Sequence, residues 1–162
     1  MSGVVAIKSK DSVVQKLFYS LSSIQHRGQD SAGIIISDGS YLDRVKAMGL
    51  VNEVFNDNNL KYHDGKIGIG HVRSAPEGCN RDYNVEPLLS FVKDNELSIA
   101  HDGNLINYYD LKSKEEKKGM VFHTQTDSEL ILFLIARYFE GDIVKAVRRA
   151  MEDIKGAYSC VL

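Results

Sequence analysis

The sequence predicts a single domain that mixes helices and strands. Apolar runs of strand length alternate along the chain with segments whose apolar residues keep helical spacing. The length of 162 residues suits one domain. Hydrophobic residues make up 43% of the chain and charged residues 26%, which is typical of a globular protein and excludes collagen-like, disordered and disulfide-scaffold classes.

The chain is expected to begin with a strand and a helix. Residues 4–7 form a short apolar run next to the N-terminus, which predicts a strand. Apolar side chains between Val13 and Ile24 then recur at helical spacing. Either Asp11 or Ser12 is the expected N-cap of this helix, because both side chains can accept a hydrogen bond from the first turn.

A β-hairpin is predicted next. Residues 32–36 are typical of a buried strand, and the turn signal Asp38-Gly39 follows them. Residues 41–45 then supply the second strand of the hairpin. The stretch at 56–59, which is rich in Asn and Asp, predicts a loop.

Two further strands are predicted in the middle of the chain. The first, at residues 66–72, is interleaved with glycines. The second, at residues 97–101, is expected to end at a tight Asp102-Gly103 turn. The Lys/Glu run at 112–118 predicts a solvated loop or the end of a helix.

The C-terminal part predicts two helices and a last strand. Residues 127–138 carry an apolar face, and Thr126 with Glu129 predicts a capping box at their start. Residues 143–151 predict a short helix with a basic outer face. The apolar residues 157–162 predict a strand whose open edge is a liability, so we expect the chain to continue in a longer protein.

Composition disfavours several functions. No apolar run approaches the ~18 residues of a membrane span, and the N-terminus lacks a signal-peptide pattern, so we expect no membrane and a cytoplasmic location. Twenty basic and 22 acidic residues give a net charge of −2, so no nucleic-acid partner is expected. The five histidines lack paired ligand spacing, and neither a metal nor another cofactor is expected. Two distant cysteines suit a reduced protein, and Cys79 is expected to be inert.

The N-terminus contains a candidate nucleophile. If Met1 is removed, Ser2 carries a free α-amino group beside its own hydroxyl. An α-amine has a pKa near ~7.7–8.0 and can act as the base for such a hydroxyl. A Met-Ser start is also common in proteins without this chemistry, and by itself it favours that plainer interpretation.

Four more polar clusters accompany the N-terminus, at residues 24–33, 68–73, 101–104 and 124–129. Arg73 ends a predicted strand and offers a planar fork for a carboxylate, although a structural ion pair explains it equally well. Backbone N–H groups in the 101–104 cluster can point into a cleft. A helix cap explains much of the last cluster but leaves Asp127 free to bind an amine.

Together the clusters resemble class II (N-terminal-nucleophile) glutamine amidotransferases, and within that class the amidophosphoribosyltransferase family. The most specific run is Gln-His-Arg-Gly-Gln-Asp-Ser-Ala-Gly at 25–33. Five others follow in register: Gly-Leu-Val at 49–51 with Glu-Val-Phe at 53–55, Gly-His-Val-Arg at 70–73, Gly-Asn-Leu-Ile-Asn at 103–107, Thr-Asp-Ser-Glu at 126–129 and Lys-Gly-Ala-Tyr-Ser at 155–159. The resemblance covers the chain from Ser2 to Leu162.

This resemblance implies an α+β fold, a four-layer αββα sandwich of two antiparallel sheets. It also implies hydrolysis of the side-chain amide of glutamine, with ammonia released and a glutamyl-enzyme formed. Ser2 takes the nucleophile position, and Gly103 would lend an N–H to the oxyanion hole. Arg73 would hold the α-carboxylate of glutamine or a similar amino acid, and Asp127 its α-ammonium. Arg27 would order the N-terminal region beside the substrate.

The resemblance has consequences for domain organisation as well. It implies that residues 1–162 form a type-2-like glutamine amidotransferase domain that is incomplete at its C-terminus. In the family a phosphoribosyltransferase domain follows, and it is absent from this sequence. The expected partners are therefore such a domain or subunit, and further copies of the same chain in a homo-oligomer.

Three positions depart from the family pattern. Ser2 replaces a cysteine, Asp102 replaces an asparagine that precedes Gly103, and Ser74-Ala75-Pro76 replaces Tyr-Ser-Thr. A hydroxyl is a weaker nucleophile than a thiol, a carboxylate has no donor for an oxyanion, and proline lacks a backbone donor. We therefore expect impaired glutaminase chemistry. The alternatives are an active amide hydrolase that uses Ser2, and a non-catalytic scaffold or regulatory partner of a transferase.

Overall fold

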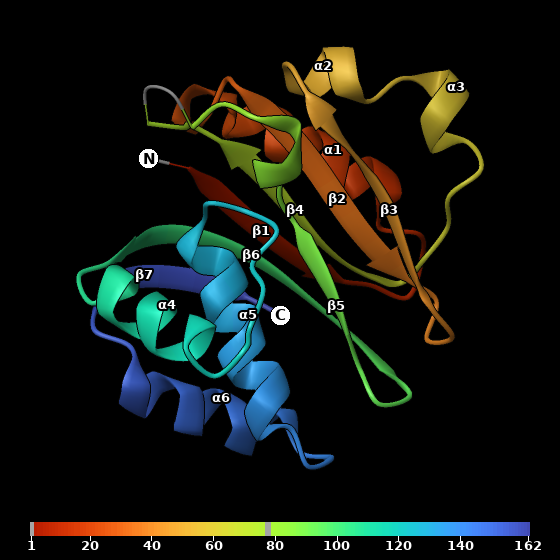
Figure 1. Ribbon diagram of the computed structural model, residues 1–162. Coiled ribbons are helices and arrows are strands. Elements are labelled where there is room, and N and C mark those ends of the chain that lie inside the picture. The colour runs from red at the N-terminus through yellow and green to blue at the C-terminus, as the bar shows by residue number, and fades with distance from the viewer. Residues whose placement is uncertain (1, 77–78) are drawn as a thin grey trace.

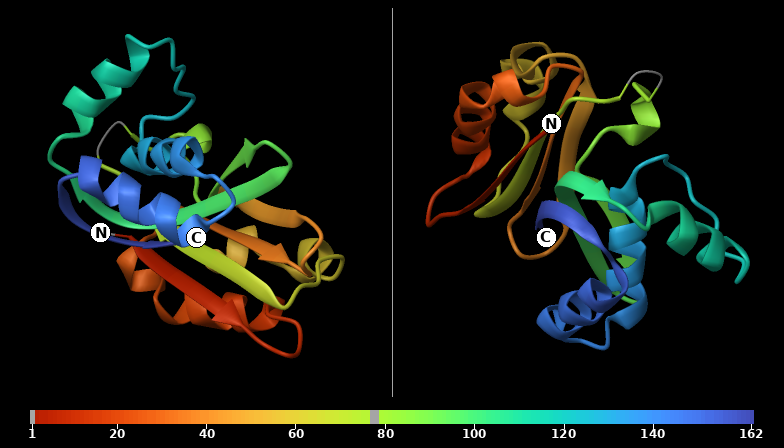
Figure 2. Two further views of the ribbon diagram at one scale, coloured as in Figure 1. Left: turned by 90° about the horizontal axis from the view of Figure 1, so that it is seen from below. Right: turned by 90° about the vertical axis from the view of Figure 1, so that its left-hand side faces the viewer.

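The computed structural model describes residues 2–76 and 79–162. Two antiparallel sheets stack face to face, and helices cover the outer face of each sheet (Figure 1). The layers therefore run helix, sheet, sheet, helix, which is the predicted α+β sandwich. Two further views show that the N-terminal half of the chain builds one helix–sheet pair and most of the C-terminal half builds the other (Figure 2).

The first sheet has four strands in the order β1-β4-β2-β3. Every neighbouring pair in it is antiparallel. Its strands are β1 (Gly3–Lys8), β2 (Ser31–Ser37), β3 (Leu42–Met48) and β4 (Ile67–Arg73). Its outer face is covered by α1 (Val14–Ser23) and α2 (Val51–Val54), and α3 (Asp57–Leu60) lies in the connection to β4.

Glycines in β4 explain how closely α1 approaches the sheet. A Cβ atom added to Gly68 would lie 2.7 Å from Leu17 Cδ1, and one added to Gly70 would lie 3.0 Å from Leu21 Cδ1. Both distances are shorter than ordinary contacts, so these positions admit the two leucines of α1 because they lack side chains. The residues of β4 that alternate with these glycines point to the opposite face, toward the second sheet and the site described below.

The second sheet has the strand order β5-β6-β7, with β5 (Leu88–Val92), β6 (Asn95–Leu105) and β7 (Gly156–Val161). The long strand β6 pairs with β5 over residues 95–99 and with β7 over residues 100–105. Its outer face packs against α5 (Asp127–Tyr138) and α6 (Ile143–Asp153), and α4 (Tyr108–Glu116) lies beside α5. No helix in the described part of the chain is long and apolar enough to cross a membrane.

Three apolar clusters fill the three interfaces between the four layers. Ile34 and Ile36 of β2 join α1 in the first cluster, whereas Ile35 points the other way, between the sheets. Between the sheets Ile35 meets Ile69 and Ala100. The third cluster joins the second sheet to α5 and α6. Strand β2 is thus apolar on both faces because both faces are covered.

Two local predictions were wrong, and a third left two possibilities that the structure decides. The N-cap position of α1 is occupied by Val13, whose side chain makes no hydrogen bond, so neither Asp11 nor Ser12 is the N-cap. The stretch expected to be a loop contains α3, because Asn56 caps a helical turn by accepting from Asn58 and Asn59. The Lys/Glu run falls at the end of a helix, α4, which is one of the two predicted possibilities.

Two predictions close to the site were also wrong. Thr126 is the N-cap residue of α5 but makes no capping bond, and the Glu129 carboxylate accepts instead from the main chain of His123 and Thr124. The predicted capping box is therefore absent. The expected turn at Asp102-Gly103 is absent too, because β6 continues through these residues to Leu105 and pairs there with β7.

Candidate active site

A cleft of about 410 Å³ opens between the two halves of the sandwich. Its wall includes five of the residues singled out from the sequence: Ser2, Arg73, Asp102, Gly103 and Asp127. They come from the N-terminus, the end of β4, the centre of β6 and the start of α5. The fold therefore brings together residues that lie up to 125 positions apart in the chain.

Strand alternation explains how β6 serves this cleft. Ala100 faces the first sheet, whereas Ile99 and Leu105 face the helices of the last layer. Because successive side chains of a strand point to opposite faces, Asp102 points toward the first sheet and His101 toward α5. Their partners agree: Asp102 contacts Ser2, and His101 Nδ1 lies 3.0 Å from Ser128 Oγ.

Two hydrogen-bond donors from the layer of the first sheet bind the carboxylate of Asp102. The main-chain nitrogen of Ser2 donates to Asp102 Oδ1 at 2.7 Å. An Arg27 terminal nitrogen donates to Asp102 Oδ2 at 2.9 Å, and Arg27 Nε donates to the carbonyl of Ser2 at 2.8 Å. Arg27 thus lies behind Asp102 and the N-terminus, outside the wall of the cleft. Both carboxylate oxygens of Asp102 therefore act as hydrogen-bond acceptors.

The hydroxyl of Ser2 faces the cleft. It accepts a hydrogen bond from the main-chain nitrogen of Ser74 at 3.3 Å, and Ser2 itself is only 8% exposed. Pro76 and Cys79 lie on the same wall of the cleft. Removal of Met1, which the proposed chemistry of Ser2 requires, concerns a residue outside the described ones.

Asp127 and Arg73 lie on different walls. Asp127 Oδ2 accepts from the main-chain nitrogen of Leu105 at 3.0 Å, and Asp127 Oδ1 lies 3.5 Å from His101 Nδ1. Arg73 is largely buried, and its terminal nitrogen lies 3.5 Å from Glu86 Oε1. Within the described residues, Arg73 Nε has no hydrogen-bond partner. Both side chains therefore keep unused bonding capacity.

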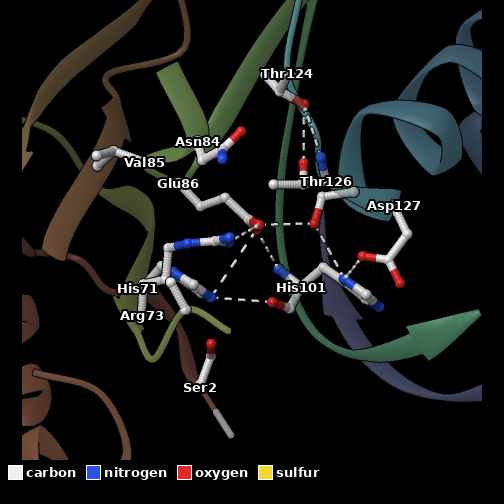
Figure 3. Close-up of polar contacts among 12 residues, drawn as sticks. Ser2, His71, Arg73, Asn84, Val85, Glu86, His101, Thr124, Thr126 and Asp127 are labelled. Atoms are coloured by element: carbon white, nitrogen blue, oxygen red, sulfur yellow. Dashed lines mark hydrogen bonds and ion pairs between the residues drawn. The ribbon is translucent and has the colours of Figure 1, made fainter. Parts of the chain in front are cut away.

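Glu86 is a central residue that the sequence motifs do not reveal. Its buried carboxylate accepts from Ser128 Oγ at 2.7 Å and from the main-chain nitrogen of His101 at 3.0 Å (Figure 3). The one signal for it in the sequence is a charged residue set between Val85 and the apolar run that begins at Pro87. Nothing in that pattern indicates that residues of three separate elements, β4, β6 and α5, surround its carboxylate.

Burial changes the titration of two groups in this network. It lowers the pKa of His71 to about 4, because the charged imidazolium is poorly solvated there. His71 Nε2 bonds to the carbonyl of His101 at 2.9 Å as a neutral ring. Burial raises the pKa of Glu86, since it disfavours the charged carboxylate, and the hydrogen bond from Ser128 opposes this effect.

The described residues contain no cluster of three or more His, Cys, Asp or Glu side chains that could hold a metal ion. The groups that line the cleft include several hydroxyls, among them that of Ser2, three carboxylates, the guanidinium of Arg73, a thiol, an imidazole and side-chain amides. Such a set suits the binding of a zwitterionic amino acid, with a carboxylate on Arg73 and an ammonium on Asp127.

Comparison with known proteins agrees with this fold. A family model described as "Glutamine amidotransferase domain" matches residues 71–162. The chain belongs to this family of glutamine amidotransferase domains. Within it, the chain resembles the glutamine amidotransferase domain of amidophosphoribosyltransferase.

Two relatives and two solved structures show the extent of this similarity. The amidophosphoribosyltransferase of Archaeoglobus fulgidus is 40% identical over 166 residues, which cover 100% of this chain and 36% of the relative. That of Bacillus subtilis is 38% identical over 161 residues, covering 99% and 34%. A structure titled as the allosteric regulatory enzyme of purine biosynthesis matches with a TM-score of 0.92 and 38% identity, covering 99% of this chain and 34% of that one.

The glutamine phosphoribosylpyrophosphate amidotransferase of B. subtilis, solved with ADP and GMP, matches with a TM-score of 0.90 and 37% identity, again over 99% of this chain and 34% of that one. The chain thus spans about a third of the length of these relatives. The similarity concerns their glutamine amidotransferase part.

Proposed function

We propose that this domain binds glutamine or a similar amino acid but hydrolyses the side-chain amide poorly. The observation that carries the proposal is the double engagement of Asp102, by the Ser2 nitrogen at 2.7 Å and by Arg27 at 2.9 Å. A carboxylate in this position offers no hydrogen to a developing oxyanion and repels its charge. Loss of one oxyanion donor typically costs about 10²–10³ in rate.

Ligand binding is supported by the opposite walls of the cleft. Arg73 Nε lacks a partner among the described residues, and a carboxylate is the group that best fits a guanidinium fork. Asp127 keeps one oxygen, Oδ1, whose contact with His101 Nδ1 is 3.5 Å long. A ligand with an α-carboxylate and an α-ammonium satisfies both residues together.

One experiment separates this proposal from its alternatives. Glutamine binding to the purified protein is measured by calorimetry, and ammonia release is followed in a coupled assay. We expect binding that Asp127→Ala abolishes, whereas Asp110→Ala, at an exposed acid of α4, leaves it intact. We expect ammonia release to be close to background.

The alternative functions give different results in the same experiment. Fast ammonia release that Ser2→Ala abolishes indicates an active hydrolase that uses Ser2 as nucleophile. The absence of both binding and ammonia indicates a scaffold or regulatory partner of a transferase. Either result contradicts the proposal.

The remaining context also belongs to the proposal. Because the relatives carry the name amidophosphoribosyltransferase and are about three times as long, we propose that the domain works with a phosphoribosyltransferase domain or subunit in purine synthesis. A cytoplasmic location and a homo-oligomer are proposed with it, and the thiols of Cys79 and Cys160, which form no disulfide in the described chain, suit a reducing compartment. Light scattering of the purified protein tests the oligomer directly.

A further inference from the structure

A buried carboxylate stands at the floor of the cleft. The side chain of Glu86 is 2% exposed, and the residue precedes β5. Its two hydrogen-bond donors, the Ser128 hydroxyl and the His101 main-chain nitrogen, are neutral (Figure 3). Such donors lower the cost of burying a charge but do not balance it.

The charged and titratable groups around Glu86 come from four elements: His71 and Arg73 of β4, His101 of β6, Asp127 of α5 and Lys46 of β3. Arg73 lies 3.5 Å from the carboxylate. His71 Nε2 lies 3.9 Å away, but a pKa of about 4 keeps this ring neutral near pH 7. Lys46 donates its ammonium to the carbonyls of Val85 and Pro87 instead. Arg73 is therefore the permanent cation that faces Glu86.

Arg73 is also the residue to which the proposed function assigns the ligand's α-carboxylate. One guanidinium then faces two carboxylates, one from the protein and one from the ligand. A bound α-carboxylate draws the charge of Arg73 away from Glu86 and adds a second negative charge beside it. A buried carboxylate that loses its counter-charge becomes neutral by taking up a proton, since this costs less than remaining charged.

We propose that Glu86 is a specificity-determining positioning residue, which competes with the ligand's α-carboxylate for Arg73 and takes up a proton when an α-amino acid binds. This inference rests on the proposed function, because it requires the α-carboxylate to bind at Arg73. The proton comes from solvent and forms an O–H bond on the Glu86 carboxyl, and no bond of the ligand changes. With Glu86 neutral the cleft suits a zwitterionic amino acid. With Glu86 ionised and paired to Arg73, it suits an amine that lacks a carboxylate.

The direction of the pH effect follows from this competition. Burial already raises the pKa of Glu86, which brings protonation closer to neutral pH. Ligand binding raises it further, so the bound state holds the proton to higher pH than the free state. Glutamine binding is therefore tightest at low pH, weakens by up to tenfold per pH unit between the two pKa values, and is constant above them.

The test uses calorimetry on the purified protein from pH 5.5 to 8.5. Each titration is run in two buffers that differ in ionisation enthalpy, because the difference in heat reports the number of protons taken up. L-glutamine is compared with L-glutaminol, which has a hydroxymethyl group in place of the α-carboxylate. We expect proton uptake with glutamine, up to one per site, and none with glutaminol. This comparison needs no variant.

A variant then identifies the group that takes up the proton. Glu86→Gln keeps the shape and an acceptor oxygen but cannot ionise. We expect it to abolish the uptake and to tighten glutamine binding more at pH 8.5 than at pH 5.5, by about tenfold at the higher pH. Glu116→Gln, which removes a charge from an exposed position on α4, is the matched control and is expected to behave as the wild type. Thermal unfolding checks that both variants fold.

The results that overturn the inference are separate from those that overturn the proposed function. Glutamine binding without proton uptake at any pH in the range contradicts the role of Glu86, and so does uptake that persists in Glu86→Gln. If glutamine binds neither protein at any pH, the proposed function fails and the inference fails with it. If Glu86→Gln does not fold, the comparison of glutamine with glutaminol in the wild type decides alone.

Discussion

The main-chain nitrogen of Ser2 donates a 2.7 Å hydrogen bond to the carboxylate of Asp102, across the interface between the two sheets. The bond joins the residue that precedes the first strand of one sheet to the central strand of the other. It also places an acidic side chain directly on the nitrogen that would act as the base for the Ser2 hydroxyl. Asp102 is thus part of the structure of the site as well as of the chemistry that we propose for it.

Replacing Asp102 by Asn tests the chemical side of this relationship. The variant keeps the shape of the side chain and supplies an N–H donor to the oxyanion position. We expect ammonia release from glutamine to increase by about 10²-fold or more, measured in a coupled assay at saturating glutamine. Adding Ser2→Ala to this variant is expected to remove the gain. A gain that survives without the Ser2 hydroxyl would show that Ser2 is not the nucleophile.

Replacing Arg27 by Gln tests the structural side. Arg27 bonds both to the Ser2 carbonyl and to Asp102, in a partly exposed position. We expect the free energy of unfolding to fall by about 1–2 kcal/mol, measured by denaturant titration. The loss is expected to be smaller in an Asp102→Asn background, because no carboxylate is then left without its partner. Arg44→Gln, at a site on β3 remote from the cleft, is the control, and an equal loss there would contradict the prediction.

A third prediction concerns Gly103. Its φ of +154° disfavours other residues, and an added Cβ would lie 2.5 Å from both the Ala157 carbonyl oxygen and Tyr158 Cα of β7. These backbone atoms cannot move without opening the β6–β7 pairing. We expect Gly103→Ala to destabilise the domain by about 3 kcal/mol or more, measured by chemical unfolding.

Gly119→Ala is the matched control for this change. Gly119 also has a positive φ, +91°, but nothing lies within 4 Å of an added Cβ. Only backbone strain remains there, so we expect a loss of about 1 kcal/mol. If the two variants lose the same stability, the close approach of β7 is not what requires glycine at position 103.

The buried His71 predicts a loss of stability in acid. Its pKa is about 4 in the folded protein, against an ordinary value of 6.5, so the unfolded chain binds more protons between these pH values. The stability that His71 contributes is therefore present above pH 6.5 and is lost as the pH falls toward 4, by about 3 kcal/mol in total. Glu86 acts in the opposite sense, because its raised pKa contributes stability that is lost as the pH rises.

Variants at two histidines isolate this effect. His71→Gln keeps a donor for the His101 carbonyl and cannot be protonated, so its unfolding free energy is expected to fall less between pH 6.5 and 4 than that of the wild type. His123 is exposed, and His123→Gln is expected to follow the wild-type curve. Parallel curves for all three proteins would contradict the prediction.

The sequence predicts the layers of the fold better than the details of the site. Apolar periodicity locates β1, β2, β4, α5, α6 and β7 to within about two residues, because each of these elements buries a regular face. The short elements α2, α3 and β5 escaped prediction because four or five residues are too few to show a period. Gly103 suggests a turn, but its actual cause is a neighbouring strand 55 residues further along the chain.

The sequence motifs predict one site formed by six residues, and the cleft is lined by five of them, whereas Arg27 lies outside its wall. The motifs do not identify Glu86, because the importance of that residue comes from contacts with positions 73, 101 and 128. No local pattern encodes these contacts from three separate elements. Long-range polar networks of this kind can be recognised only in the tertiary structure.

Because side chains alternate between the two faces of β6, the domain is sensitive to insertions in this strand. His101 serves one layer and Asp102 the opposite one only because each stands on its own side of the strand. Inserting one residue into β6 ahead of His101 would exchange odd and even positions, and would turn the carboxylate toward α5 and the imidazole toward Ser2. Inserting two residues would restore each side chain to its side, displaced along the strand. A single residue inserted into this strand would therefore break contacts between the two halves of the sandwich that most single substitutions leave in place.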